Sequence, residues 1–306
     1  MIPNDNLENL LVTGDRGFVG QHALTQIANA TGLSTLDKSL DIRDKPKLLQ
    51  CLQKFKPNTV LHLAAKCFVP DSFLSPENTF DVNFIGTLRL LEALAETGFT
   101  GRFLYVSSGD AYGLVLPEQL PIREELQLRP RNPYAVSKAA AEALCYQWSV
   151  TGPFEVVVAR PFNHIGAGQA PTFALSDFAR QIAEIAAGKR PPVLQVGNID
   201  LTRDFTDVRE VVRAYQMLLE QGHNGEIYNV CSGEERSVRS MLEKLLQVAG
   251  IHADIVRDVT RNRTAEQLRV VGSHEKLTQH TGWRPEISID DTLFNLYRYW
   301  EKKFGS

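Results

Sequence analysis

The chain has 306 residues, of which 43% are hydrophobic and 23% charged, and its formal net charge at pH 7 is -3. This length suits one large α/β domain or two closely packed ones, and the dispersed Lys and Arg residues form no basic surface for nucleic acid. No apolar run approaches the roughly 18 residues of a membrane span, and residues 1–9 lack the pattern of a signal peptide. We therefore expect a cytoplasmic protein that binds neither nucleic acid nor a membrane.

Short apolar runs alternate with amphipathic helical stretches along the first half of the chain. We expect strands at residues 9–12, 34–36, 59–63, 103–106 and 155–159, and helices at residues 18–30, 45–54, 78–97 and 134–150. This alternation predicts an α/β fold of the Rossmann type, in which helices cover both faces of a doubly wound parallel sheet.

The regular alternation ends after Asn163. Helices are expected at residues 176–188, 207–221, 237–249 and 290–303, with short strands between them. This part predicts a smaller C-terminal α/β lid that binds substrate. We place a dinucleotide-binding domain at residues 1–166 and a substrate-binding domain at residues 167–306, with a segment near 203–232 returning to the first domain.

A glycine-rich loop follows the first expected strand directly and precedes an expected helix. Its three glycines permit a tight turn, a close approach of the backbone to a pyrophosphate, and close packing of the helix on the sheet. The spacing differs from the G-x-G-x-x-G form, but the position between strand and helix favours a dinucleotide site. The residues expected to form it are Gly14, Arg16, Gly17, Phe18, Val19 and Gly20.

Charged residues that follow the second expected strand bear on the choice of cofactor. Asp37 lies where an acid can accept both ribose hydroxyls of the adenosine half, which favours NAD(H). Arg16 and Lys38 are near enough in sequence to meet a 2′-phosphate, so NADP(H) stays open. Asp41 and Ile42 could hold the adenine, although Asp41 could equally be an ordinary loop acid.

Neither a metal site nor a disulfide is indicated. The four cysteines are far apart in sequence, and the histidines show no zinc-binding spacing. Each cysteine is interpreted as a small core residue, and His62 as a satisfied buried histidine without a chemical role.

Tyr134 and Lys138 stand four residues apart in an expected helix, with Asn132 suited to the N-cap and Pro133 to the first helical position. Residues with this spacing lie on one helix face, so the phenol and the ammonium point the same way. A nearby positive charge lowers the pKa of a phenol, and we therefore expect Tyr134 to act in general acid or base catalysis. A chance pairing on a surface helix remains the alternative.

Taken together, these motifs resemble the extended short-chain dehydrogenase/reductases that act on nucleotide sugars, and the resemblance spans the whole chain. It rests on the glycine loop, on Leu63-Ala64-Ala65 after the third strand, on Tyr134-x-x-x-Lys138, and on further segments at residues 83, 107–113, 160–166, 203–208 and 228–233. The resemblance implies that Leu63, Ala64 and Ala65, with Tyr134 and Lys138, contact an NAD(P)H cofactor.

The resemblance also implies roles for the residues at the catalytic centre. Ser108 would orient the substrate carbonyl with Ser107 as its supporting neighbour, Tyr134 would give its proton to the C4 oxygen, and Lys138 would lower the phenol pKa. A hydroxyl at the carboxyl end of a parallel strand is well placed to donate to a developing oxyanion.

The tripeptide around Gly109 bears on the type of reaction. Dehydratases of this family have a hydroxyl residue followed closely by Glu, whereas this chain has Gly109 and the shorter Asp110. Reduction of a carbonyl needs no second carboxylate. Asp110 could equally be a residue of the turn.

Residues of the second half are expected to bind a GDP-sugar. The resemblance implies that Asn163 and Arg203 hold the diphosphate, that Arg263 meets a phosphate, and that Glu266 takes the ribose hydroxyls. Arg180 could approach the guanine or phosphate, or could be a solvated helical residue.

The function implied is the NAD(P)H-dependent reduction of the C4 keto group of GDP-4-dehydro-6-deoxy-D-mannose to give GDP-6-deoxy-D-mannose (GDP-D-rhamnose). A dehydratase or epimerase of the same fold is one alternative, and a sensor of NAD(P) or nucleotide sugar without turnover is another. Relatives pair through the helices that carry Asn83 and Tyr134, so we expect a homodimer.

Overall fold

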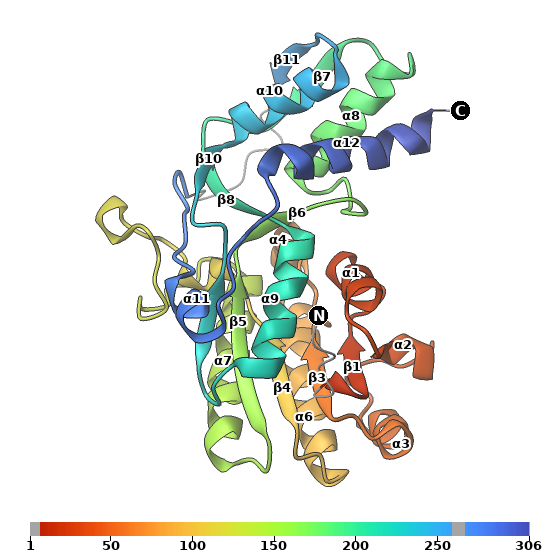
Figure 1. The fold of residues 1–306 in the computed structure, drawn as a ribbon, viewed down its shortest axis with the longest axis vertical. Helices are drawn as coiled ribbons and strands as arrows, with labels where there is room; N and C mark the ends of the chain where they lie inside the picture. The colour runs from red at the N-terminus through yellow and green to blue at the C-terminus, as the bar shows by residue number, and fades with distance from the viewer. Residues whose placement is uncertain (1–6, 259–266, 306) are drawn as a thin grey trace.

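A six-stranded parallel sheet forms the centre of the larger part of the molecule (Figure 1). The computed structural model describes residues 7–258 and 267–305. Strands β2 and β3 lie on opposite sides of β1, so the chain changes direction there and opens a crevice at the carboxyl ends of the strands. In spatial order the strands are β2 (Ala30–Gly32), β1 (Leu10–Thr13), β3 (Thr59–His62), β4 (Arg102–Val106), β5 (Glu155–Pro161) and β9 (Ile227–Val230).

Helices cover both faces of this sheet because its strands are apolar on both sides. Leu10 and Val12 pack into one core with α1 (Phe18–Gln26), α9 (Val208–Gln221) and α11 (Glu275–Thr281). Leu11, between them, points into the opposite core, which contains α3 (Lys45–Phe55), α6 (Gly86–Glu96) and α7 (Pro133–Thr151). The predicted doubly wound sheet is confirmed.

A smaller part of the molecule lies above the crevice end of the sheet (Figure 1). Its core is formed by α8 (Ala174–Ala186), α10 (Val238–Ala249) and α12 (Ile289–Phe304), beside the parallel pair β7 (Val193–Val196) and β11 (Asp254–Arg257). A three-stranded sheet of β10 (Glu235–Ser237), β8 (Thr202–Asp207) and β6 (Asn163–Ile165) lies between the two parts. Helix α9 and strand β9 belong to the larger part, while the domain boundaries stay a prediction.

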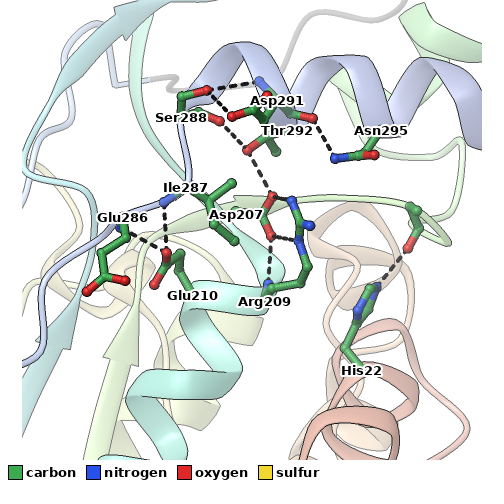
Figure 2. Close-up of polar contacts among 11 residues, drawn as sticks. His22, Asp207, Arg209, Glu210, Glu286, Ile287, Ser288, Asp291, Thr292 and Asn295 are labelled. Atoms are coloured by element: carbon green, nitrogen blue, oxygen red, sulfur yellow. Dashed lines mark hydrogen bonds and ion pairs between the residues drawn. The ribbon is translucent and has the colours of Figure 1, made fainter.

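Two carboxylates at the start of α9 bind the two parts together (Figure 2). Asp207 caps α9 by accepting from Arg209 N at 2.8 Å, and its Oδ2 accepts from the Thr292 hydroxyl of α12 at 2.9 Å. Glu210 Oε1 accepts from the amides of Glu286 and Ile287, both at 2.8 Å. Because these carboxylates are buried, the contacts fix α12 and the segment before it, in the smaller part, to α9 in the larger part.

The strand predicted at residues 34–36 is wrong. The strand β2 ends at Gly32, and Leu33–Leu36 form the short helix α2. Asp15 accounts for the difference, because its carboxylate accepts hydrogen bonds from the backbone N–H and the hydroxyl of Ser34, in the first turn of α2. An anion at this position stabilises a helical turn over an extended strand.

The helix predicted at residues 78–97 is present but is not uniform. It begins as α5 (Pro76–Phe80), widens into a π-helical turn at Asp81–Ile85, and continues as α6. A further helix, α4 (Val69–Leu74), precedes it and was not predicted. The π-helical turn carries Asn83, which hydrogen-bonds into the site described below.

Candidate active site

The glycine loop after β1 forms a cradle that has no room for side chains. Gly14 has a φ of +70°, and a Cβ there would lie 2.7 Å from Ala64 N. Gly17 N donates to Gly14 O at 2.9 Å, and a Cβ on Gly20 would overlap Gly14 O. The N-cap of α1 is Gly17, which has no side chain to cap the helix, so the first turn of α1 begins at the cradle. These features fit the diphosphate of a dinucleotide.

A cavity of about 230 Å³ opens at this loop. His22 lies at its wall and bonds through Nε2 to Ala167 O at 2.8 Å, which ties α1 to the loop after β6 (Figure 2). Gln21, His22 and Tyr299 were not predicted here; Gln21 and His22 directly follow the glycine loop in sequence, whereas only the fold brings Tyr299 to it. The full lining is Arg16, Gly17, Phe18, Gln21, His22, Ala167, Gly168 and Tyr299.

The expected adenosine-binding residues gather beside the glycine loop. Arg16 Nη2 donates to Lys38 O at 2.9 Å, which brings the cation next to Asp37. Asp37 accepts from both the N–H and the hydroxyl of Ser39, and these hydrogen bonds lower its pKa. The carboxylate therefore stays ionised and able to accept further hydrogen bonds.

Asp41 and Ile42 are less suited to the adenine-binding role expected of them. Both oxygens of Asp41 are held by the Arg43 guanidinium, at 2.9 and 2.7 Å, which lowers the pKa of Asp41 to about 2. Ile42 is buried against the core of the sheet. An adenine amino group would have to share the Asp41 carboxylate with Arg43.

Tyr134, Lys138 and Ser108 meet at the carboxyl end of β4. The helix α7 begins at Pro133, with Asn132 Oδ1 accepting from Ala135 N at 2.7 Å, as the sequence predicts. Lys138 Nζ donates to Val106 O at 2.7 Å, and the Ser108 hydroxyl lies near enough to the Tyr134 phenol to act on its pKa. A phenol, a hydroxyl and an ammonium thus converge on one point of the crevice.

The expectation that the pKa of Tyr134 lies below its usual value is wrong. Burial is the dominant influence and raises the pKa of Tyr134 well above its usual value, with Cys67 and Asp110 adding to the effect. Burial also lowers the pKa of Lys138 to about 8. At neutral pH the pair is therefore a protonated phenol beside an ammonium, which is the state of a proton donor.

A chain of buried hydrogen bonds fixes the loop after β3, where Leu63, Ala64 and Ala65 lie. Thr13 Oγ1 bonds to His62 Nδ1 at 2.7 Å and accepts from Ala64 N at 3.2 Å, and His62 Nε2 bonds to Thr87 Oγ1 at 2.9 Å. Burial lowers the pKa of His62 to about 3, so its ring is neutral. His62 has the structural role that the sequence analysis gave it.

Asn83 connects the loop after β3 to α7, the helix that carries Tyr134 and Lys138. Its amide accepts from Lys66 N at 2.8 Å and donates to Lys66 O at 3.0 Å and to Ser137 Oγ at 2.9 Å. The sequence analysis noted Asn83 but gave it no role in the site. The available signal was a single amide between the apolar neighbours Val82 and Phe84.

Ser107 is turned away from the crevice. It is buried, and its hydroxyl donates to Glu142 Oε1 on α7. Glu142 in turn forms a buried ion pair with Arg160, with 2.6 Å between Oε2 and Nη2. Ser107 thus contacts Glu142 on α7, and Ser108 is the serine of the pair that faces the crevice.

The expected substrate-binding residues are only partly brought together. Asn163 is exposed at the start of β6, and Arg203 on the neighbouring β8 donates to Thr202 O and Gln267 O at 2.7 and 2.8 Å. Arg180 is held on α8 by Asp177 and Glu184, both at 2.6 Å, so substrate binding would compete with two ion pairs. Arg263 and Glu266 lie outside the described residues.

Gly109 packs closely against an aromatic ring. A Cβ there would lie 3.3 Å from the Phe162 ring, tighter than an ordinary contact, while Asp110 is exposed. A larger residue at this position would therefore have to displace Phe162. Within residues 7–258 and 267–305, no cluster of three or more His, Cys, Asp or Glu side chains could hold a metal ion. None of the helices in these ranges is long and apolar enough to span a membrane.

Comparison with known proteins agrees with this geometry. Residues 36–295 match the family model for GDP-mannose 4,6 dehydratase. The chain is 47% identical to a GDP-6-deoxy-D-mannose reductase of Pseudomonas aeruginosa, over 97% of this chain and 98% of that protein. It is 30% identical to a GDP-mannose 4,6-dehydratase of Vibrio cholerae, over 82% of this chain and 75% of that one.

Solved structures of related proteins have the same fold. RMD from Pseudomonas aeruginosa, complexed with NADPH, superposes with a TM-score of 0.91 at 46% identity, covering 96% of this chain and 99% of that one. The UDP-glucose 4-epimerase of Thermus thermophilus in complex with NAD has a TM-score of 0.83 at 27% identity, covering 95% and 98%. The chain therefore belongs to the family of the GDP-mannose 4,6 dehydratase model, within the extended short-chain dehydrogenase/reductases that act on nucleotide sugars.

Proposed function

We propose that this protein reduces the C4 keto group of GDP-4-dehydro-6-deoxy-D-mannose to give GDP-6-deoxy-D-mannose, with NAD(P)H as the reductant. The observation that carries the proposal is the 47% identity, over nearly the whole chain, to a protein named for this reductase activity. The Ser108, Tyr134 and Lys138 arrangement supports it, because carbonyl reduction needs a proton donor and a carbonyl-orienting hydroxyl.

The glycine cradle and the first turn of α1 would hold the cofactor diphosphate, and Asp37, Arg16 and Lys38 would surround its adenosine ribose. When bound, NAD(P)H supplies a hydride to C4. Lys138 is placed to donate to the ribose next to the nicotinamide, as the family resemblance implies. The structural neighbour with bound NADPH, and others with NAD, support a nicotinamide cofactor.

Tyr134 would donate the phenolic proton to the C4 oxygen as that oxygen gains charge, so the carbonyl becomes a secondary alcohol. Ser108 would hold the oxygen through its hydroxyl, and Lys138 would stabilise the phenolate that forms when the proton leaves. The pKa of Tyr134, raised by burial, keeps the phenol protonated before the reaction. This state suits reduction, in which the tyrosine starts as the acid.

The residues after Ser108 favour reduction over dehydration. A dehydratase must also remove the C5 proton and protonate the leaving C6 hydroxyl, and Gly109 can do neither. Asp110 is one methylene shorter than Glu, which matters when reacting atoms must lie within about 3.5 Å. A sensor without turnover would have no use for the complete set of Ser108, Tyr134 and Lys138.

The test supplies GDP-4-dehydro-6-deoxy-D-mannose with NADPH or NADH, follows the oxidation of the cofactor by its absorbance, and identifies the sugar by NMR. Stoichiometric oxidation with formation of a 4-hydroxy sugar is expected. GDP-mannose with NADP⁺ serves as the matched substrate for the dehydratase alternative. Its conversion to the 4-keto sugar, with no reduction of that keto sugar, would contradict the proposal.

We also propose that the protein forms a homodimer through α7 and the helical segment that carries Asn83, and that it works in the cytoplasm. Exposed apolar side chains on α7 and α4 support the pairing, since a monomer gains nothing from leaving them in water. They are Phe73, Leu74, Val136, Tyr146 and Val150. All four cysteines are free, which suits a reducing compartment. Light scattering that shows a monomer at micromolar concentration would contradict the dimer.

A further inference from the structure

Glu142 lies on the same face of α7 as the catalytic pair, one helical turn beyond Lys138. Tyr134, Lys138 and Glu142 are spaced at i, i+4 and i+8, so their side chains follow one line along the helix. Glu142 is buried. Its carboxylate accepts from the Ser107 hydroxyl, and the Arg160 guanidinium donates to both of its oxygens. The carboxylate therefore touches the strand end that carries Ser108.

Arg160 extends this contact across the sheet. Its Nη1 donates to the Tyr112 hydroxyl at 2.9 Å, and that hydroxyl donates to Asn229 Oδ1 at 2.7 Å. Asn229 Nδ2 donates in turn to Ile122 O at 3.0 Å. The network thus links the carboxyl ends of β4, β5 and β9 beneath the crevice.

Stability alone does not account for this ion pair. Its side chains are only 5% and 4% exposed, and the cost of removing both charges from water offsets most of their attraction. Apolar residues of similar size would hold the fold about as well. What they could not supply is a fixed acceptor for Ser107 and a negative charge near Lys138.

We propose that Glu142 is a positioning residue for the reaction, fixing the Ser107-Ser108 strand end through one oxygen and keeping Lys138 charged through its own negative charge. The inference rests on the reductase function proposed above. Glu142 contacts neither substrate nor cofactor in this scheme and acts through Ser107 and Lys138.

The groups around Lys138 single out Glu142 as the source of negative charge. Cys67, which has exposed surface, and the buried Cys145 also face Lys138, but desolvation raises the pKa of both thiols above its usual value, so they are neutral at pH 7. His62 and Tyr134 are neutral for the reasons given above, and Tyr105 offers its ring at 5.0 Å. Among these groups, the carboxylate held by Arg160 alone carries a formal charge opposite to that of Lys138.

The first test is Glu142→Gln, which keeps an acceptor for Ser107 and removes the charge. NMR of the protein with ¹³C-labelled lysine, with the Lys138 signal assigned by its loss in Lys138→Met, measures the pKa of Lys138 without cofactor or substrate. We expect this pKa to fall by roughly 1 unit in Glu142→Gln, and the alkaline limb of kcat to move with it. If the pKa of Lys138 is unchanged in a folded Glu142→Gln variant, the proposed charge role of Glu142 is overturned.

The matched control is Tyr112→Phe, which cuts the same network on the far side of Arg160 and leaves Glu142 charged. Its Lys138 titration is expected to follow the wild type. An equal shift in Tyr112→Phe would mean that any loosening of the network moves Lys138, and would overturn the specific role of Glu142.

Ser107→Ala tests the second contact and stays informative if Glu142→Gln does not fold. We expect a fall in kcat of about tenfold with little change in KM and no shift of the Lys138 signal, because Ser108 loses its orientation while the charge remains. An unchanged kcat, or a raised KM alone, would overturn the positioning role. If wild-type protein gives no turnover at all, the proposed function fails, whereas the NMR result still decides the charge role of Glu142.

Discussion

Lys138 Nζ donates a hydrogen bond of 2.7 Å to Val106 O, the last carbonyl of β4 before Ser107 and Ser108. This bond anchors the ammonium to the strand end that presents the catalytic hydroxyl. The helix therefore does more than place Lys138 four residues after Tyr134. It holds the phenol and the ammonium in a fixed position relative to the strand end that carries the hydroxyl.

Removal of the Tyr134 hydroxyl should abolish most of the activity. Tyr134→Phe keeps the buried ring, so we expect the fold and NADPH binding to persist while kcat falls by about 10²- to 10⁴-fold. Steady-state kinetics and a fluorescence titration with NADPH measure the two effects. Tyr146→Phe, on the exposed face of the same helix, is the control. Full turnover in Tyr134→Phe would exclude the phenol as the proton donor.

The activity should decline on the alkaline side as Lys138 loses its proton. Burial lowers the pKa of Lys138 to about 8, so the ammonium is present below that pH and is lost above it. The pKa of Tyr134 is raised, so the phenol titrates later. We expect kcat/KM, measured from pH 6 to 10, to fall above about pH 8 in wild type. Lys138→Arg, which keeps its charge throughout, should have lower activity without that decline. A decline that persists there would assign it to another group.

A side chain at Gly14 should prevent cofactor binding. Gly14→Ala combines a φ of +70° with a Cβ 2.7 Å from Ala64 N, so the cradle has to open. Gly188→Ala is a matched control, because its φ is +68° and no atom lies within 4 Å of the added Cβ. The control should cost about 1 to 2 kcal/mol of stability from backbone strain alone. Thermal unfolding with and without NADPH separates the effects, and equal NADPH stabilisation of both variants would contradict the assigned site.

The cofactor preference should respond to the residues around the adenosine site. Arg16→Ala is expected to raise KM for NADPH about tenfold and to change KM for NADH much less, because the 2′-phosphate is the anionic group that NADPH has and NADH lacks. Lys54→Ala, with the same loss of charge on an exposed part of α3, is the control. Equal changes for both cofactors would remove Arg16 from the phosphate site. Asp37→Ser should act in the opposite direction, by weakening NADH binding.

The parts of the site that depend on local spacing could be predicted from the sequence. The turn at Gly14 and the face shared by Tyr134 and Lys138 follow from backbone geometry, so the glycine loop and α7 lie where expected. The pKa of Tyr134 could not be predicted, because burial by residues distant in sequence outweighs its helical neighbour. The direction of Ser107 depends likewise on Glu142, thirty-five residues away.

The second strand shows the same limit for the fold. Residues 34–36 were expected to form a strand, yet the Asp15 carboxylate accepts hydrogen bonds from Ser34 and the segment forms α2. Such a contact is set by the tertiary fold, and no local propensity indicates it. The segment that holds Asp37 is therefore a helix end, with the acid still beside Arg16 and Lys38.

The most direct test of hydride transfer to C4 uses NADPH that carries deuterium at the reactive position of the nicotinamide. The enzyme is supplied with GDP-4-dehydro-6-deoxy-D-mannose, and the product is examined by NMR. The account predicts one deuterium at C4 of the sugar for each NADPH oxidised, with a new hydroxyl on the same carbon. A sugar without deuterium, or one that keeps its 4-keto group, would contradict it.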